Sequence, residues 1–138
     1  TWPTIIEPFV INPDHARQVS DFINTHTAPN DTVIVSPAIA WRIHAHDVDF
    51  TLAPAQIIDN RVYFWGLEDQ SSMPLRRFAY DPRYTHAHYV IIDNLWYTWG
   101  IHHAEGAWEM LNDVRYTWPA VFQTDTITVY ENPAFVTQ

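Results

Sequence analysis

The chain has 138 residues, of which 47% are apolar and 17% are charged, so it is long and apolar enough to fold around a buried core as one domain over 1–138. Its net charge of −9 argues against nucleic acid as a partner, because both surfaces would be anionic. It contains neither Lys nor Cys, which excludes Schiff-base chemistry, a P-loop, disulfides and thiolate metal sites.

The first predicted element follows residues 1–12, whose prolines and lack of periodicity indicate an extended lead-in. Residues 12–14 (Asn-Pro-Asp) are typical of a helix start, and apolar residues then recur every three or four positions. This pattern predicts a helix that packs on one side and ends at the turn residues 29–31. The β-branched run at 32–36 predicts a strand that is covered on both faces.

Pro37 interrupts this strand, and the rest of the chain alternates helical patterns with apolar runs. A second buried strand is expected at 88–93, and two final strands at 119–123 and 127–131 form a predicted hairpin. The other expected elements are a helix at 38–44, a strand at 48–52, a short helix at 55–60, a strand at 62–65, an irregular excursion at 66–86 and a helical stretch at 95–114 that Gly100 and Gly106 interrupt.

Helices that alternate with buried strands are typical of an α/β fold. We predict a small Rossmann-like three-layer sandwich with a mostly parallel sheet, to which the C-terminal hairpin adds an antiparallel edge. The runs 33–35 and 90–92 should be adjacent or nearly adjacent central strands, parallel and buried on both faces. The predicted core includes Val19, Phe22, Ile23, Ile34, Val90, Ile92, Leu111 and Val121.

Polar residues follow both buried strands, at the end of an open α/β sheet where ligands bind. Ser36 follows the first strand, and Asp93 and Asn94 follow the second. These groups could hold a sugar or ribose hydroxyl, beside rings that could stack on a ligand or form a docking face: Trp41, Trp96 and Trp99. The alternative is that the polar residues make turns or helix caps and that the tryptophans belong to the core.

Two His-x-His pairs suggest a metal site, because alternate residues of a strand share one face. The pairs are His44 with His46 and His86 with His88, and nearby carboxylates could complete a site: Asp47, Asp49 and Asp81. The alternative is that these histidines bind water or the backbone. No serine lies in a nucleophile-elbow motif, and the spacing of the carboxylates identifies no acid–base pair, so the sequence marks no catalytic residue.

Three segments of the chain form a family-like pattern. They have the sequences PDHARQVSDFINTHTAPNDTVIVSP at 13–37, AHYVIIDNLWYTWG at 87–100 and WPAVFQTDTITVYENP at 118–133. The pattern resembles the C-terminal extracytoplasmic domain of bacterial polytopic glycosyltransferases of the family 39 type, which are relatives of the dolichyl-phosphate-mannose–protein mannosyltransferases. Asn30 stands where glycine is common in that family.

The resemblance implies an enzyme that transfers sugar from a polyprenyl-phosphate donor, with its catalytic carboxylate in a loop between membrane helices. On that basis, we expect this chain to be a piece of a longer protein and a soluble accessory domain on the extracytoplasmic face of the cell membrane. Its expected partners are the transmembrane portion of the same polypeptide and an acceptor glycan or protein, and it needs no cofactor. Two alternatives are a sugar- or nucleotide-binding module centred on Ser36 and Asp93, and a metal-dependent hydrolase built on the histidine pairs.

Overall fold

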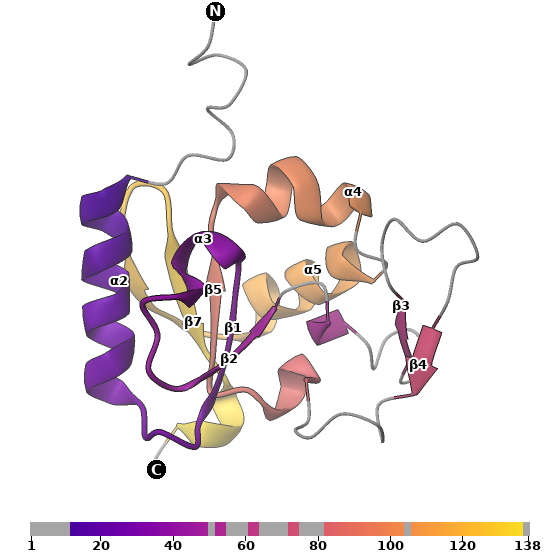
Figure 1. Ribbon diagram of the computed structural model, residues 1–138, viewed down its shortest axis with the longest axis horizontal. Coiled ribbons are helices and arrows are strands. Elements are labelled where there is room, and N and C mark those ends of the chain that lie inside the picture. Colours follow the sequence, from indigo (N-terminus) through magenta and orange to yellow (C-terminus); the bar gives the residue numbers. More distant parts are fainter. Residues whose placement is uncertain are drawn as a thin grey trace, which may run out of the picture.

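The computed structural model describes residues 12–49, 52–54, 61–63, 72–74, 82–103 and 106–136. Within these ranges the chain has an α/β fold, with a five-stranded mixed sheet in the order β2-β1-β5-β7-β6 (Figure 1). The strands of this sheet are β1 (Thr32–Val35), β2 (His46–Asp49), β5 (Tyr89–Ile92), β6 (Ala120–Gln123) and β7 (Thr128–Glu131).

Helix α2 (Pro13–His26) begins where the sequence predicts it. The side-chain oxygen of Asn12 accepts a hydrogen bond from the backbone N–H of Asp14 at 2.9 Å, and Pro13 at the first helical position has no N–H that needs a partner. The predicted apolar stripe of the helix packs on the sheet through Ala16, Val19 and Ile23. The predicted one-sided helix is therefore confirmed.

Strands β1 and β5 are the parallel neighbours that the two β-branched runs predict, with Val33 opposite Tyr89 and Ile34 opposite Val90. All residues of β5 are buried, as are the last three of β1. Alternation along β1 directs Val33 and Val35 toward the face that α2 covers, and Ile34 toward the other face. The prediction of central strands covered on both faces is confirmed.

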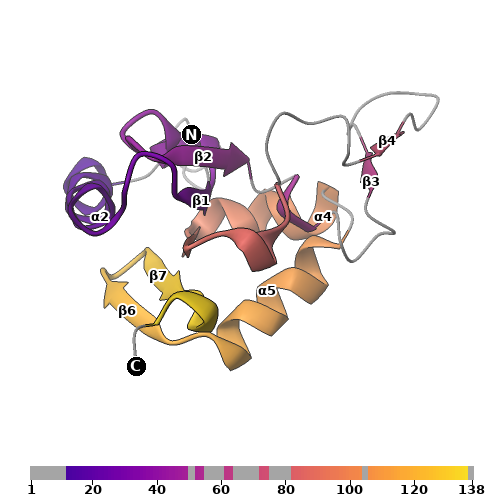
Figure 2. The same cartoon turned by 90° about the horizontal axis from the view of Figure 1, so that it is seen from below.

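The second face is covered by helix α5 (Ala107–Thr117) and by the segment before it. Met110, Leu111 and Val114 of α5 pack with Trp96 against the β1 and β5 side chains on this face. Gly106 precedes the helix with a φ of 82°, a left-handed conformation that favours glycine. Figure 2 shows α2 and α5 on opposite sides of the sheet, which gives three layers.

The prediction of a mostly parallel, Rossmann-like sheet is wrong. Strand β1 is parallel to β2 and β5, but β7 is antiparallel to both of its neighbours, β5 and β6. The C-terminal hairpin forms as predicted. However, the chain crosses from β5 to the edge position of β6 and returns along β7, so the second strand of the hairpin lies inside the sheet.

Two predicted core residues are not fully buried. Val121 is 37% exposed, because it lies on the edge strand β6 where the register with β7 shifts between Ala120 and Phe122. Phe22 is half-buried and stacks on Phe122, with 4.9 Å between the ring centroids. The other six predicted core residues are buried: Val19, Ile23, Ile34, Val90, Ile92 and Leu111.

The middle of the chain differs most from prediction. Helix α3 (Pro37–Ala40) is shorter than the predicted 38–44, and β2 begins two residues earlier than the predicted strand at 48–52. The predicted irregular excursion contains β4 (Ser72–Pro74), which pairs with β3 (Arg61–Tyr63), and a 3₁₀ helix, η4 (Tyr84–His86). Residues 1–11 of the predicted lead-in at 1–12 lie outside the described residues, as does the predicted helix at 55–60.

The predicted helical stretch after β5 is divided into three elements. A π-helix, η5 (Trp96–Gly100), leads into α4 (Ile101–His103), and α5 follows after Gly106. Downstream of the hairpin, a 3₁₀ helix, η6 (Pro133–Phe135), ends the described chain. Within the described ranges, no helix combines the length and the apolar run that crossing a membrane requires.

Candidate functional site

Ser36 and Asp93 lie together at the carboxyl ends of β1 and β5. These strands are parallel neighbours, so the residue that follows each strand lies at the same edge of the sheet. The Ser36 hydroxyl donates a hydrogen bond to the Asp93 carboxylate, whose other oxygen accepts from the backbone N–H of Leu95 at 2.9 Å. The structure thus brings together the two polar residues that the sequence suggests as a ligand site.

This pair is sealed inside the protein. Ser36 is fully buried and Asp93 is 1% exposed. Burial raises the pKa of the Asp93 carboxyl, while the hydrogen bonds from Ser36 and Leu95 act in the opposite direction. Both carboxylate oxygens therefore accept hydrogen bonds from the chain itself, and a ligand could reach them only after the surrounding chain moved.

The predicted aromatic residues occupy three different environments at this edge. Trp41 follows α3 and is 73% exposed, and the guanidinium of Arg42 lies 4.3 Å above its ring. Trp99 is half-buried. Asn94, the remaining polar residue of the predicted ligand site, is exposed. Trp96 is fully buried in the core against the α5 face of the sheet, so its ring has no open surface for stacking.

The π-helix η5 explains why Trp96 and Trp99 differ in burial. Trp96 and Gly100 face the core from η5, whereas Tyr97 and Thr98 between them are exposed. A π-helix places side chains at a spacing that differs from that of an α-helix. The sequence gives no indication of this turn, and the positions of Trp96 and Trp99 depend on it.

The histidine pairs do not have the strand geometry that the metal prediction requires. His44 precedes β2 and His46 is its first residue, while His86 lies in η4 and His88 comes just before β5. Three of these histidines, His44, His46 and His86, are exposed, as is Asp47. Among the described residues, no group of three or more His, Cys, Asp and Glu residues is placed to hold a metal ion. The Asp49 side chain and Asp81 lie outside the described part.

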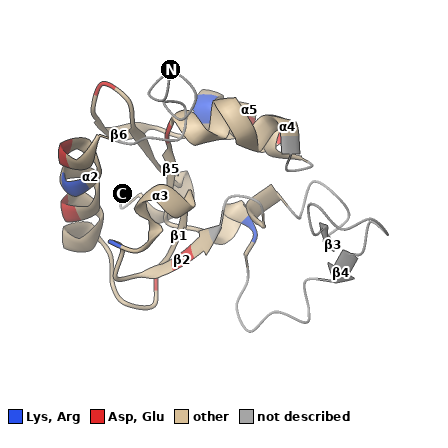
Figure 3. Cartoon of the chain, turned by 45° about the horizontal axis from the view of Figure 1, so that its top comes forward, with Lys and Arg blue, Asp and Glu red and all other residues tan. Residues whose placement is uncertain are grey.

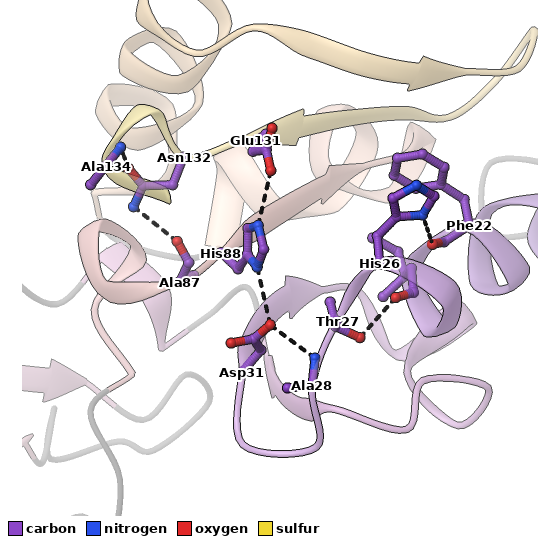
Figure 4. A network of polar contacts seen from close by, with 11 residues as sticks. Phe22, His26, Thr27, Ala28, Asp31, Ala87, His88, Glu131, Asn132 and Ala134 are labelled. Atoms are coloured by element: carbon purple, nitrogen blue, oxygen red, sulfur yellow. Dashed lines mark hydrogen bonds and ion pairs between the residues drawn. The ribbon is translucent and has the colours of Figure 1, made fainter. Parts of the chain in front are cut away.

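His88 instead joins two carboxylates at the opposite edge of the sheet (Figure 4). Its Nδ1 lies 3.1 Å from a carboxylate oxygen of Asp31, and its Nε2 lies 2.9 Å from one of Glu131. Asp31 also accepts a hydrogen bond from the backbone N–H of Ala28 at 3.0 Å. Each ring nitrogen of His88 therefore contacts a carboxylate, and the side chain links the ends of β1, β5 and β7.

Aromatic rings cover both faces of the His88 imidazole. The Tyr89 and Phe135 rings stack on it at centroid distances of 4.1 Å and 4.7 Å. Burial raises the pKa of Tyr89 to about 12, and the Glu131 carboxylate adds to this effect. These contacts limit the access of a ligand to the ring, which favours a structural role for His88 in this arrangement.

Asn132, beside this network, connects the segment after β7 to the segment before β5 through hydrogen bonds. Its side-chain amide donates to the backbone oxygens of Thr85 and Ala87, both at 2.9 Å, and its side-chain oxygen accepts from Ala134 N–H. Sequence reasoning selected His88 as a possible metal ligand and missed Asp31 and Glu131. One signal was available: Asp31 immediately precedes the first predicted parallel strand, and His88 is the first residue of the second.

Comparisons of the chain with protein-family models, with curated proteins and with solved structures found no match.

Proposed function

We propose that this chain is a non-catalytic, extracytoplasmic domain of a membrane-embedded glycosyltransferase that uses a polyprenyl-phosphate sugar. In this proposal, the domain lies on the extracytoplasmic face of the membrane and acts by contact with the transmembrane portion of the same polypeptide. The resemblance of three segments to that family supports the identity of the parent enzyme, and the exposure of Trp41 supports the contact role.

The three family-like segments form one continuous part of the fold. Segment 13–37 supplies α2 and β1, segment 87–100 supplies β5 and η5, and segment 118–133 supplies the hairpin. Together they provide the adjacent strands β1-β5-β7-β6. Because the segments pack against one another, their pattern describes a single folded unit, as expected of a domain resemblance.

Trp41 is the observation that carries the contact role. Its indole is 73% exposed at the sheet edge where Ser36 and Asp93 are sealed, and Arg42 lies over one side of the ring. An exposed tryptophan beside a guanidinium is typical of protein contact surfaces, since both residue types are enriched there. A neighbouring domain that covers this edge would remove the ring from water without needing access to Asp93.

The two alternative functions have less support from the geometry. A sugar- or nucleotide-binding module at Ser36 and Asp93 would need open hydrogen-bonding groups, but these two side chains bond each other in a buried position. A hydrolase built on the histidine pairs would need a convergent donor set, whereas His88 is held between two carboxylates.

The test uses the parent enzyme in its membrane, with sugar transfer from the polyprenyl-phosphate donor as the measurement. Replacing Trp41 with Ala should lower transfer by about tenfold, the size of effect typical of an interface anchor. Val121→Ala is the matched control, because Val121 is also exposed but lies on the far edge strand β6. This control should retain full transfer.

Three outcomes would overturn the proposal. The first is a parent gene that encodes no membrane spans, and the second is equal transfer by the Trp41→Ala and Val121→Ala enzymes. The third is sugar transfer by the isolated 138-residue chain at an enzyme-like rate, above about 1 per second.

A further inference from the structure

Helix α5 and the π-helix η5 place a basic residue among tyrosines on a surface separate from Trp41. The guanidinium carbon of Arg115 lies 5.9 Å from the ring centre of Tyr97 and 5.8 Å from that of Tyr116. Tyr130 of β7 lies close enough to interact electrostatically with Arg115 and Tyr97. Three elements therefore converge on this guanidinium. Figure 3 shows a basic position of α5 in blue.

The same flank of α5 continues toward the start of the helix. Trp108, Asn112 and Arg115 are spaced by four and three residues, so they share one face and span about 10 Å along the axis. The indole of Trp108 is 49% exposed, and Tyr116 beside Arg115 is 78% exposed. We call this surface the α5 strip, defined by Trp108, Asn112, Arg115, Tyr116 and Tyr97.

The chemistry of the α5 strip is that of a saccharide site. An exposed indole offers a flat apolar surface to a sugar ring, an amide can bond hydroxyls, and tyrosines provide both properties. The N–H groups of a guanidinium point outward in its plane. When the flat face of the group lies over aromatic rings, these N–H groups can still donate to the two oxygens of a carboxylate. An exposed Trp and an Arg on one helix face therefore fit a sugar and its acidic substituent together.

We propose that the α5 strip binds acidic saccharides, with the sugar ring on Trp108 and its carboxylate on Arg115. The chain as a whole carries a net charge of −9, so long-range electrostatics oppose an anionic ligand. Binding therefore depends on the local guanidinium, and it is sensitive to the removal of that one group. Saccharide binding would be a second role beside the contact role proposed above. This second proposal does not depend on the identity of the membrane portion.

Calorimetric titration of the whole 138-residue chain with trigalacturonic acid tests the proposal. The fully methyl-esterified trisaccharide is the matched neutral probe and should bind about tenfold more weakly, because it lacks the carboxylates. Arg115→Gln should weaken binding of the acid by about tenfold, and Trp108→Ala by about fivefold. Raising NaCl from about 0.05 M to 0.5 M should also weaken binding of the acid.

Two variants control for charge and for exposed aromatic surface. Arg17→Gln removes an arginine from α2 that pairs with Asp14, and Phe135→Ala removes an exposed ring from η6. Both should bind the acid as the unmodified chain does. If Arg115→Gln fails to fold, as judged by circular dichroism, Tyr116→Ala takes its place, because Tyr116 is the most exposed member of the strip.

The proposal is overturned if trigalacturonic acid does not bind, if the neutral ester binds equally well, or if Arg17→Gln weakens binding as much as Arg115→Gln. These failures leave the contact proposal intact, because that proposal is tested on the membrane enzyme through Trp41. Conversely, loss of the Trp41 effect in the membrane enzyme does not alter the titration of the isolated chain.

Discussion

Two side chains show how far single residues can be interpreted from sequence. Asp93 was selected because it follows a predicted strand, and it does lie beside Ser36, since strand position alone fixes that neighbour. Its burial was not predictable, because burial depends on tertiary packing that the local sequence pattern does not indicate. His88 was selected for its spacing to His86, yet its partners are Asp31 and Glu131, 57 and 43 residues away.

Asp93 gives a prediction about pH. Burial raises the pKa of its carboxyl above the ordinary value of 3.8, so the folded chain binds this proton more tightly than the unfolded chain does. The contribution of Asp93 to stability therefore falls as the pH rises from 3.8 through the raised pKa, and it stays low above that value. Asparagine can accept from Leu95 and donate to Ser36 without a charge, so Asp93→Asn should gain stability relative to the unmodified chain as the pH rises.

Urea unfolding between about pH 4 and pH 8 measures this difference. The free energy of unfolding of Asp93→Asn minus that of the unmodified chain should increase across the range. Asp47→Asn, on the exposed part of β2, controls for the loss of one negative charge. A difference for Asp93→Asn that stays flat or decreases with pH would show that the buried carboxyl does not titrate in this way.

At the scale of elements, the sequence predicted those parts that local patterns determine. The β-branched runs predicted β1 and β5 because parallel strands covered on both faces must be continuously apolar. The cap at Asn12 and the stripe from Ala16 predicted α2, and the two short runs near the C-terminus predicted the hairpin. The position of β7 between β5 and β6 depends on long-range pairing, and no local pattern indicates it.

The network around His88 connects three of these strands, so its loss should destabilise the sheet. His88→Ala removes two contacts to carboxylates, so Asp31 and Glu131 lose the side chain that links them. Hydrogen bonds to charged groups contribute about 1.5–3 kcal/mol each. Because all three side chains are partly exposed, which weakens the contacts, we expect a loss of about 2–4 kcal/mol in the free energy of unfolding. Denaturant unfolding at neutral pH is the measurement.

His26→Ala is the matched control for this prediction. His26 also stacks on a ring, that of Phe22, and makes one hydrogen bond to a backbone oxygen, but it is exposed on α2. Its replacement should cost less than about 1 kcal/mol, as is usual for exposed positions. Equal losses for the two variants would mean that the carboxylate contacts of His88 do not stabilise the sheet.

At the scale of the whole molecule, the two edges of the sheet have different properties. The edge with His88 is bonded internally by Asp31, Glu131 and Asn132 (Figure 4). At the edge with Asp93, the carboxyl group is buried, but the ring of Trp41 is exposed. This asymmetry is the physical basis of the proposed contact role, in which the Trp41 edge faces a neighbouring part of the same protein.

Site-specific photo-cross-linking in the proposed membrane-embedded parent enzyme tests that role most directly. A benzoylphenylalanine at position 41 should form a cross-link within the polypeptide, joining this domain to the transmembrane portion. The same probe at position 121, on the exposed edge strand β6, should not form it. Absence of the cross-link from position 41, or an equal yield from position 121, would contradict the contact role of the Trp41 edge.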